Sequence, residues 1–508
     1  MSSARDIENR IPITAGLMLA TLMNTLDGTI ANVALPHIQG SVSAGIDQIT
    51  WVLTSYIIAT AIMTPLSGWL SQKIGRKTMF LVSIGGFTIA SMLCGIATSL
   101  PELVAFRILQ GIAGASLMPL SQTMILDLYP PEQVPKVMSL WSAAVIVGPI
   151  VGPSLGGWLT EQLSWRWVFF INLPIGLMAF LGVWLFISPD RGGRARKFDF
   201  LGFGTLVLFI GAIQLMLDRG PSLDWFSAPE IWAELLLALV GLWIFTVHTM
   251  TAKQPFFDRA LMRDRNFLTA SVFGFFIGIL LFSTMALLPP MMQGLMGYPV
   301  LTSGLVSMPR GLGSFVAMFL VGQLVGRVDT RAILMTGLSL NAVALWMMMG
   351  FDLSMNADLI MISGVIQGLG IGLIFVPLST LAFATLAPSL RAEGSGVYTL
   401  IRNLGSGVGI SIMNALVVSN TQTMHAAMAG KINPSDPAIA ASLAGRFDLN
   451  SVQGLLSLNA EITRQATMVA YVDDFKLMLI ITIACMPMLL LMRKPKGPAG
   501  GAPHVEVD

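Results

Sequence analysis

The stretch NTLDGTIANVALP, residues 24–36, places a carboxylate, Asp27, inside an apolar run long enough to cross a lipid bilayer. A charged side chain near the middle of a bilayer costs about 3 kcal/mol on insertion scales, so such residues face a bundle interior or an aqueous cavity. Carboxylates in this position carry protons or contact substrate, and a purely structural ion pair is the alternative. The sequence therefore predicts a membrane protein organised around Asp27.

The composition is that of a polytopic membrane protein. Of 508 residues, 54% are hydrophobic and only 11% are charged, and the mean hydropathy is +0.75. A soluble domain carries about 25% charged residues, and this much apolar side chain exceeds what one core can bury. The two cysteines, Cys94 and Cys485, lie in separate apolar runs, and the four histidines are scattered along the chain. We therefore expect no disulfide framework, no metal or haem site and no cofactor.

Hydropathy predicts fourteen membrane-spanning helices of about 20 residues each. They are expected at residues 13–36, 50–70, 78–98, 102–126, 136–160, 167–187, 200–218, 230–250, 267–289, 302–326, 332–350, 358–386, 394–419 and 473–492. An even number of spans places both termini on one side, and most of the 29 Lys and Arg residues fall in the loops of that side. By the positive-inside rule that side is the cytoplasm. The polar N-terminal stretch is expected to precede a retained first helix rather than a cleaved signal.

Loop lengths divide the predicted spans into groups of six, two and six. Basic cytoplasmic stretches at 188–199 and 251–266 flank one helix pair. The expected parts are an N-terminal six-helix bundle (1–187), two inserted helices with their linkers (188–266), a C-terminal six-helix bundle (267–492) and a cytoplasmic tail (493–508). Two similar bundles around a central site are typical of alternating-access transporters.

One long hydrophilic segment, residues 420–472, is expected on the outer, periplasmic face. It contains NPSDP at 433–437, followed by two stretches of helical periodicity. A solvated hairpin that caps the outer mouth and a docking surface for another protein are both consistent with this pattern.

Several motifs, in the expected order and on the expected sides, resemble those of the major facilitator superfamily. LDGTIANVALP (26–36) is similar to the first-helix motif of its 14-span drug:proton antiporter branch, the EmrB/QacA-like family. GWLSQKIGRK (68–77) resembles the superfamily's loop between the second and third helices. RILQG (107–111) and GPIVGPSLGG (148–157) are similar to its fourth-helix motif and its fifth-helix antiporter motif.

Two further motifs, WRWVFFINLPIG (165–176) and LDRGPSLDWF (217–226), resemble the EmrB-like exporters in particular. The resemblance covers essentially the whole chain and implies the major facilitator fold, all-α, with six, two inserted and six transmembrane helices. It implies a transporter rather than an enzyme: proton-coupled efflux of varied hydrophobic or amphipathic drugs, hence antibiotic resistance, across the bacterial inner membrane. It also implies a periplasmic membrane-fusion adaptor and an outer-membrane channel as partners, with residues 420–472 as the candidate contact.

Asp27 and Arg107 are the candidate proton-coupling residues. Asp27 lies about nine residues, and Arg107 about five, from the outer ends of their predicted helices, so at about 1.5 Å per residue both fall in the outer half of the membrane. A neighbouring arginine favours the ionised carboxylate and burial favours the protonated one, which would let Asp27 switch as the cavity opens to either side. The resemblance implies Asp27 as proton carrier and Arg107 as its partner; a static salt bridge is the alternative.

The fifth predicted helix carries candidate packing and gating residues. Gly148, Gly152 and Gly156 recur every four residues and share one face, which favours close helix approach. Pro149 and Pro153 remove backbone donors and bend the helix. Ordinary packing is the alternative to a hinge or proton seal here.

The loop at 68–77 is a candidate for the cytoplasmic gate. The loop begins with Gly68, and Gly75 near its end allows a tight turn. Arg76 belongs to a basic cluster that anchors the cytoplasmic face. The superfamily pattern has an acidic residue where this chain has Gln72, which puts a charge relay through that position in question.

Other polar residues at membrane depth are candidates for the substrate cavity or for hydrogen bonds between helices. Two of them, Arg310 and Arg402, have no evident acidic partner in the second bundle's spans, and each could instead pair with a helix C-terminus or a carbonyl. The full set is Asn24, Asn32, Tyr56, Gln110, Gln122, Gln214, Arg310, Gln367 and Arg402.

Two other functions are alternatives to drug efflux. A dedicated exporter of one metabolite, siderophore or fatty acid would have the same sequence features. A membrane-embedded proton-pumping enzyme subunit would carry aligned histidines and acidic pairs across several spans, and intramembrane acids are scarce here. The phosphate-binding loop GxxxxGK[ST] is absent from the sequence, so the expected energy source is the proton gradient and not ATP.

Overall fold

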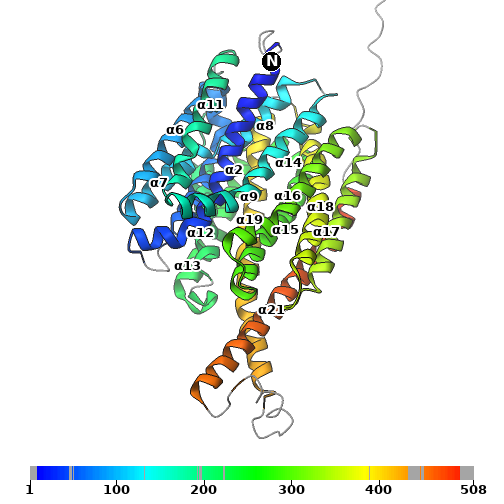
Figure 1. Ribbon diagram of the computed structural model, residues 1–508. Helices are drawn as coiled ribbons and strands as arrows, with labels where there is room; N and C mark the ends of the chain where they lie inside the picture. The colour runs from blue at the N-terminus through cyan, green and yellow to red at the C-terminus, as the bar shows by residue number, and fades with distance from the viewer. Residues whose placement is uncertain are drawn as a thin grey trace, which may run out of the picture.

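The computed structural model of the protein is a bundle of long helices (Figure 1). It describes residues 8–44, 49, 51–130, 132–190, 193, 197–220, 223–325, 327–387, 390–432, 447 and 451–491, so the predicted tail at 493–508 lies outside it. These ranges contain no β-strand, only an isolated bridge between Val325 and Val328. The predicted all-α class is confirmed.

The first group of helices, called here the first bundle, surrounds α2. Its members are α2 (Arg10–Ser41), α4 (Trp51–Met63), α5 (Leu66–Ile74), α6 (Arg76–Ile96), α7 (Leu100–Gly114), α8 (Leu117–Leu128), α9 (Val134–Gln162), α10 (Trp167–Phe170) and α11 (Asn172–Phe186). α2 packs against α9 and α11, α7 packs against α4 and α6, and α6 also packs against α11. We call the two ends of the molecule the Arg10 end and the Ser41 end, after the ends of α2.

The remaining helices form an α12–α13 pair and a second bundle. They are α12 (Phe200–Arg219), η2 (Trp225–Ser227), α13 (Pro229–Thr251), α14 (Arg259–Arg263), α15 (Arg265–Pro290), η3 (Met291–Leu295), α16 (Val300–Leu324), α17 (Thr330–Met348), α18 (Ala357–Ala384), α19 (Arg391–Ala429), α21 (Val452–Cys485) and η5 (Met486–Leu491). In the second bundle α15 packs against α19, α18 packs against α16 and α17, and α19 packs against α21. The two bundles meet most extensively where α9 packs against α16.

Membrane-spanning helices are the dominant feature of this fold. Among the described residues, eleven helices are long and apolar enough to cross a bilayer, or twelve if the bent pair α4–α5 is one span. The two predicted spans outside this set are 13–36 and 473–492, which fall in α2 and α21. Both carry ionisable side chains, Asp27 in α2 and the Asp473–Asp474 pair in α21, which lower their hydropathy. The count of fourteen stays a prediction.

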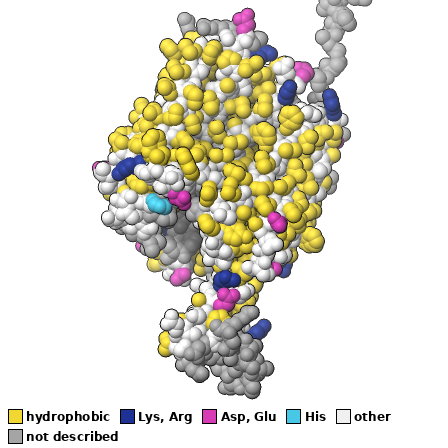
Figure 2. All heavy atoms as spheres, viewed as in Figure 1, with side chains coloured by type: hydrophobic (Ala, Val, Ile, Leu, Met, Phe, Trp, Pro, Cys, Tyr) yellow, Lys and Arg dark blue, Asp and Glu magenta, His cyan; other side chains and the backbone are white. Residues whose placement is uncertain are grey.

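The outer surface of the bundle is apolar. Trp232, Trp243 and Trp346 leave 56%, 68% and 66% of their surface exposed. Figure 2 shows hydrophobic side chains over most of the visible face, with charged side chains mainly near the top and in the lower part of the view. A continuous exposed apolar surface of this size is unfavourable in water and fits contact with lipid tails.

Several predicted helices are interrupted in the structure. The span expected at 50–70 is bent by 58° between α4 and α5, where Pro65 has no N–H to donate to the preceding turn. The span expected at 102–126 breaks between α7 and α8, and that at 167–187 breaks at Ile171, between α10 and α11. These breaks matter because they set the direction of side chains that enter the candidate site.

The glycines of α9 lie against α2. A methyl group added at Gly148 would lie 2.4 Å from Thr25 Oγ1, and one added at Gly152 would lie 2.4 Å from Thr29 Oγ1. Gly156 approaches Ile30 in the same way, at 2.8 Å. Pro149 and Pro153 lie within the continuous helix α9. A side chain at Gly148 or Gly156 would therefore meet the backbone of α2, and one at Gly152 would have to move the Thr29 side chain.

Charged side chains join the two bundles at the Arg10 end. Arg76, at the start of α6, forms an ion pair with Asp127 at the end of α8. The other carboxylate oxygen of Asp127 accepts a hydrogen bond from Arg391 Nη1 of α19, at 3.2 Å. One turn further along α19, Ser395 Oγ donates to Gln122 Oε1, at 2.9 Å. Asp127, which the sequence analysis did not single out, thus links α6 of the first bundle to α19 of the second.

The turn before Arg76 is as expected from the sequence. Gly75 has a φ of +89°, a conformation that favours glycine, and a methyl group there would lie 2.7 Å from the Asp190 carbonyl oxygen. The backbone N–H groups of Arg76 and Lys77 donate to the Asp190 carboxylate. Gly68 is buried within α5. The start of α6 is thus held by an acidic residue that follows α11.

A helical hairpin projects from the Ser41 end. α19 has 39 residues, so at about 1.5 Å per residue it is roughly 58 Å long, about twice the hydrocarbon thickness of a bilayer. The end of α19 and the start of α21 extend together beyond the bundle (Figure 1), and His425 Nε2 lies 3.0 Å from Asn459 Oδ1 between them. Of the two helical stretches predicted after NPSDP, one corresponds to the start of α21. NPSDP itself and the residues after it up to 446 lie outside the described residues.

The α2–α9 contact gives a first prediction. Replacing Gly148 with Ala should lower the melting temperature of the detergent-purified protein, because the new methyl group meets Thr25 and the α2 backbone; overpacking of this kind costs about 1–3 kcal/mol. Gly211→Ala in α12 is the matched control, since nothing lies within 4 Å of its added methyl group. Equal melting temperatures for both variants would show that α2 and α9 are not packed this closely.

The Asp127 linkage gives a second prediction. Asp127→Asn removes both ion pairs, of which only the pair with Arg391 joins the two bundles. A partly exposed pair contributes up to about 1 kcal/mol, so separation of the bundles at the Arg10 end should become up to roughly fivefold more populated. The measurement is the rate at which maleimide labels a cysteine introduced by Ser395→Cys, a position that is fully buried. Glu132→Gln, an exposed acid in the turn after α8, is the control. An unchanged labelling rate in Asp127→Asn would mean that the linkage does not hold this end closed.

Candidate functional site

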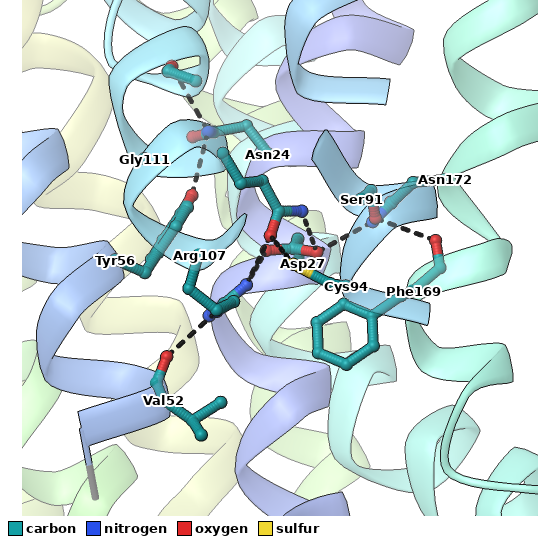
Figure 3. Close-up of polar contacts among 12 residues, drawn as sticks. Asn24, Asp27, Val52, Tyr56, Ser91, Cys94, Arg107, Gly111, Phe169 and Asn172 are labelled. Atoms are coloured by element: carbon teal, nitrogen blue, oxygen red, sulfur yellow. Dashed lines mark hydrogen bonds and ion pairs between the residues drawn. The ribbon is translucent and has the colours of Figure 1, made fainter. Parts of the chain in front are cut away.

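The candidate site is centred on a fully buried ion pair between α2 and α7. Arg107 Nη1 lies 2.7 Å from Asp27 Oδ2, and both side chains are 0% exposed (Figure 3). The contact that the sequence analysis considered geometrically feasible is therefore present. A buried charge is unfavourable unless it is paired and hydrogen-bonded, so the neighbours of both groups decide whether the site is stable.

Two amide side chains complete the shell of Asp27. Gln110 Nε2 and Asn172 Nδ2 each donate to Asp27 Oδ1, at 2.8 Å. Arg107 Nη1 also donates to Gln110 Oε1, at 2.8 Å, which orients that amide. All three atoms that contact the carboxylate are hydrogen-bond donors, so the arrangement matches an ionised Asp27.

The guanidinium of Arg107 is held on the side away from the carboxylate. Its Nε donates to the backbone oxygen of Val52 in α4, at 3.0 Å. The ring of Tyr56 lies 4.3 Å from the guanidinium carbon and that of Phe169 lies 5.6 Å from it, so cation–π contacts add to the ion pair. Nη2 is buried without a hydrogen-bond partner. Arg107 is thus fixed by α4 as well as by Asp27.

The segment that carries WRWVFFIN ties the Ser41 end of the first bundle together. Trp165 Nε1 donates to Ser41 Oγ at the end of α2, at 2.9 Å. Arg166 Nη1 donates to the backbone oxygens of Gly95 and Ala97, at 2.8 and 2.7 Å, and so satisfies carbonyls at the end of α6. These contacts anchor α10 to α2 and α6.

The break between α10 and α11 then directs Asn172 into the site. Asn172 Nδ2 donates both to Asp27 and to Ser91 Oγ, which lies 2.9 Å away on α6. Ser91 Oγ in turn donates to the Phe169 backbone oxygen, at 2.9 Å. Asn172 and Ser91 were not among the predicted site residues. The sequence did contain a signal for Asn172: it is an amide side chain inside an apolar run, within the motif at 165–176 that resembles the EmrB-like exporters.

Three predicted cavity residues lie around this site. Gln110 is within it, as described, and Asn24 Nδ2 donates to the Tyr56 hydroxyl, at 3.2 Å. Tyr56 therefore contacts Arg107 through its ring and Asn24 through its hydroxyl. Asn32, two turns beyond Asn24 on α2, is exposed.

The other predicted cavity residues are not part of the Asp27 site. Gln122 belongs to the contact with Ser395 at the Arg10 end, and Gln214 is buried where α12 meets Gly407 of α19. Arg402 Nη2 lies 3.1 Å from Met118 Sδ across the two bundles, and its guanidinium carbon lies 5.3 Å from the Phe375 ring. Arg310 and Gln367 meet at Thr284, inside the second bundle. The predicted set therefore separates into several places.

Protonation of Asp27 would weaken the contacts in its shell. A neutral carboxyl group no longer forms an ion pair with Arg107, and its O–H would be a donor among neighbouring atoms that are all donors. The groups involved sit on α7 and α11, whereas Asp27 sits on α2. A change in the charge of Asp27 would therefore affect how α2 is held by these two helices. Within the described ranges, no cluster of three or more His, Cys, Asp or Glu side chains is arranged to hold a metal ion.

Comparison with known proteins agrees with these features. The Major Facilitator Superfamily profile matches residues 17–410. The chain is 34% identical to the multidrug export protein EmrB of Escherichia coli K12 over 496 residues, 96% of both chains. It is also 34% identical to the fatty acid resistance protein FarB of Neisseria gonorrhoeae, over 96% of this chain and 97% of that one.

A solved structure shows the same fold. The human organic anion transporter MFSD10 superposes with a TM-score of 0.57 at 14% identity, covering 94% of this chain and 99% of that one. The family resemblance predicted from the motifs is confirmed, and with it the assignment as a multi-pass membrane transporter and not an enzyme. The chain belongs to the Major Facilitator Superfamily.

Proposed function

We propose that this chain exports varied hydrophobic or amphipathic compounds across the bacterial inner membrane in exchange for protons, by alternating access. The observation that carries the proposal is the buried Asp27–Arg107 pair, which loses its ionic attraction when the carboxylate gains a proton. The relatives named for multidrug export support efflux of drugs. Asp27 is the proposed proton carrier, and Arg107 its partner.

The proposed cycle uses the two states of Asp27. Ionised, Asp27 is held by Arg107, Gln110 and Asn172. Protonated, it no longer pairs with Arg107 as an ion, which loosens α2 from α7. One proton moving inward across about 100 mV provides roughly 2.3 kcal/mol. Coupling requires that drug and proton affect the same conformational equilibrium, and this linkage is reciprocal in binding free energy.

The proposed gates lie at the Arg10 end and along the α2–α9 contact. The Asp127 linkage to Arg76 and Arg391 would have to open for access from the Arg10 end, which is the cytoplasmic side in the proposed orientation. Gly148, Gly152 and Gly156 would let α2 and α9 remain in contact as the bundles rock.

The relative named for fatty acid resistance supports a second candidate, a dedicated exporter of one class of metabolite. The two candidates differ in breadth and not in mechanism. Transport of a panel of unrelated drugs and of fatty acids by the same purified protein separates them. Transport confined to fatty acids would favour the dedicated exporter.

Asp27→Asn tests the proposed coupling in proteoliposomes. The amide keeps the shape of the side chain but cannot carry a proton, so drug-driven proton movement, followed with an internal pH dye, should fall at least tenfold while drug binding stays within about threefold. Asp352→Asn is the matched control, because that carboxylate is exposed in the loop after α17. Coupled transport that persists in Asp27→Asn would place the proton carrier elsewhere.

We also propose that the projecting α19–α21 hairpin is the contact for a periplasmic membrane-fusion adaptor that leads to an outer-membrane channel. Replacing residues 425–459 with a short Gly/Ser linker should abolish resistance of whole cells but leave drug transport in inside-out vesicles within about twofold. The hairpin lies beyond the bundle, as the 39-residue length of α19 requires. Lost vesicle transport would instead make the hairpin part of the transport core.

A further inference from the structure

The second bundle contains a buried cation without an acidic partner. Arg310 of α16 is 7% exposed, and its Nη2 donates to the Leu281 backbone oxygen at 3.2 Å and to Thr284 Oγ1 at 2.9 Å, both on α15. Over the described part of the chain, no carboxylate lies within ion-pair distance of this guanidinium. A buried charge that is only partly hydrogen-bonded is strongly unfavourable, so a neutralising group at this place would stabilise the bundle.

The surroundings of Arg310 repeat those of the Asp27 site. RILQG at 107–111 in α7 is echoed by GVIQG at 364–368 in α18. A methyl group added at Gly111 would lie 2.6 Å from the Tyr56 backbone oxygen, and one added at Gly368 would lie 1.9 Å from the Arg310 backbone oxygen. α18 therefore crosses α16 through the same glycine position that α7 uses to cross α4.

The two crossings differ in where the guanidinium comes from. In the first bundle Arg107 of α7 stacks on Tyr56 of α4. In the second bundle the arginine takes the place of that tyrosine on α16, and Gly364 takes the place of Arg107 on α18. A methyl group added at Gly364 would lie 3.5 Å from Arg310 Cβ, in van der Waals contact. Each site therefore contains one arginine, supplied by a different helix.

The acid is what the second site lacks. Gln110 Nε2 donates to Asp27 at 2.8 Å, whereas its counterpart Gln367 Nε2 approaches the neutral Thr284 Oγ1 at 3.4 Å. Gln367 Oε1 is buried with no hydrogen-bond partner, so this amide is held weakly. The second bundle thus holds the arginine and the glutamine of the first site around a threonine in place of an aspartate.

We propose that Arg310, Thr284 and Gln367 form a binding site for a monovalent anionic group, which takes the position that the Asp27 carboxylate has in the first bundle. The group is either a carboxylate of the exported compound or a halide from solution; both neutralise the guanidinium, and a carboxylate can accept two hydrogen bonds from it. The carboxylate case rests on the proposed export function, and the site itself does not.

Arg402 is a weaker candidate for the same role. Its guanidinium faces the Phe375 ring at 5.3 Å and Met118 Sδ at 3.1 Å, contacts that partly offset its charge. It lacks a counterpart of Gln367 and has no position equivalent to one in the Asp27 site. Arg310 is therefore the residue to test.

The test compares an amphipathic acid with its uncharged analogue. Binding of decanoate and of decanamide to the detergent-purified protein is measured by titration in a low-salt buffer free of chloride and of other carboxylate ions. Decanoate should bind the parent chain at least tenfold more tightly, and Arg310→Gln should reduce this preference to less than twofold. Arg310→Lys, which keeps the charge but not the paired donors, should retain part of the preference.

A halide arm separates the two sources of the anion. If decanoate and decanamide bind equally but chloride added to the same buffer raises the melting temperature of the parent chain and not that of Arg310→Gln, the site takes a halide. The proposal is overturned if the parent chain shows neither effect, or if Arg310→Gln keeps either one. Should that variant fail to fold, Thr284→Val, which removes a hydroxyl from the site and leaves Arg310, should reduce the decanoate preference or the chloride effect at least threefold; an unchanged effect overturns the proposal.

The test of anion binding at Arg310 and the test of proton antiport can fail separately. Asp27→Asn should keep the anion effect, because Asp27 lies in the other bundle. Loss of proton coupling with the anion effect intact would support both proposals. Intact anion binding in a parent chain that moves no protons would leave the Arg310 site standing and remove the antiport.

Discussion

The cost of holding a charge away from water organises the first bundle. Asp27 and Arg107 are fully buried, and leaving either alone would be far more unfavourable than pairing them. Their remaining hydrogen-bonding positions draw in side chains from α7 and α11 and a backbone oxygen from α4, so four helices meet at one ion pair. The α9 glycines then allow α2 to be packed from its other side. A change in the charge of Asp27 alters the balance for every helix in this contact, which is the property that a coupling site needs.

Helix interruptions give this site its geometry. A straight sixth span would continue past Ile171 without turning, whereas the break there lets α10 be anchored by Trp165 and Arg166 while α11 directs Asn172 toward Asp27. The bend at Pro65 similarly lets α4 keep Val52 and Tyr56 beside Arg107 while α5 diverges toward the Arg10 end. A proline near each break supplies the local reason: Pro174 lies in the first turn of α11 and Pro65 directly precedes α5, and neither can donate a backbone hydrogen bond.

The sequence was informative where one residue conflicts with its surroundings. Asp27 and Arg107 stand out as charges in apolar runs, and counting residues along two helices placed them at similar depth. Asn172 and Asp127 could not be found in this way. Asn172 reaches the site through a helix break that a hydropathy profile does not show. Asp127 joins Arg76 to Arg391, and Arg391 is 264 residues away from Asp127 in the chain. Polar residues also explain why α2 is missing from the helices that are apolar enough to span a membrane. The residues that build the site in α2 lower the mean hydropathy of that helix.

The α4–α7 crossing of the first bundle and the α16–α18 crossing of the second are related in geometry but differ in net charge. At the α4–α7 crossing the arginine has its aspartate and the net charge of the buried group is zero. At the α16–α18 crossing the arginine faces Thr284, and the buried group carries a positive charge. With one neutral pair that can gain a proton and one cation that can gain an anion, each bundle can change its charge independently. The α9–α16 contact, where Gly311 of α16 packs against Ile150, lies one residue from Arg310 and mechanically links the two.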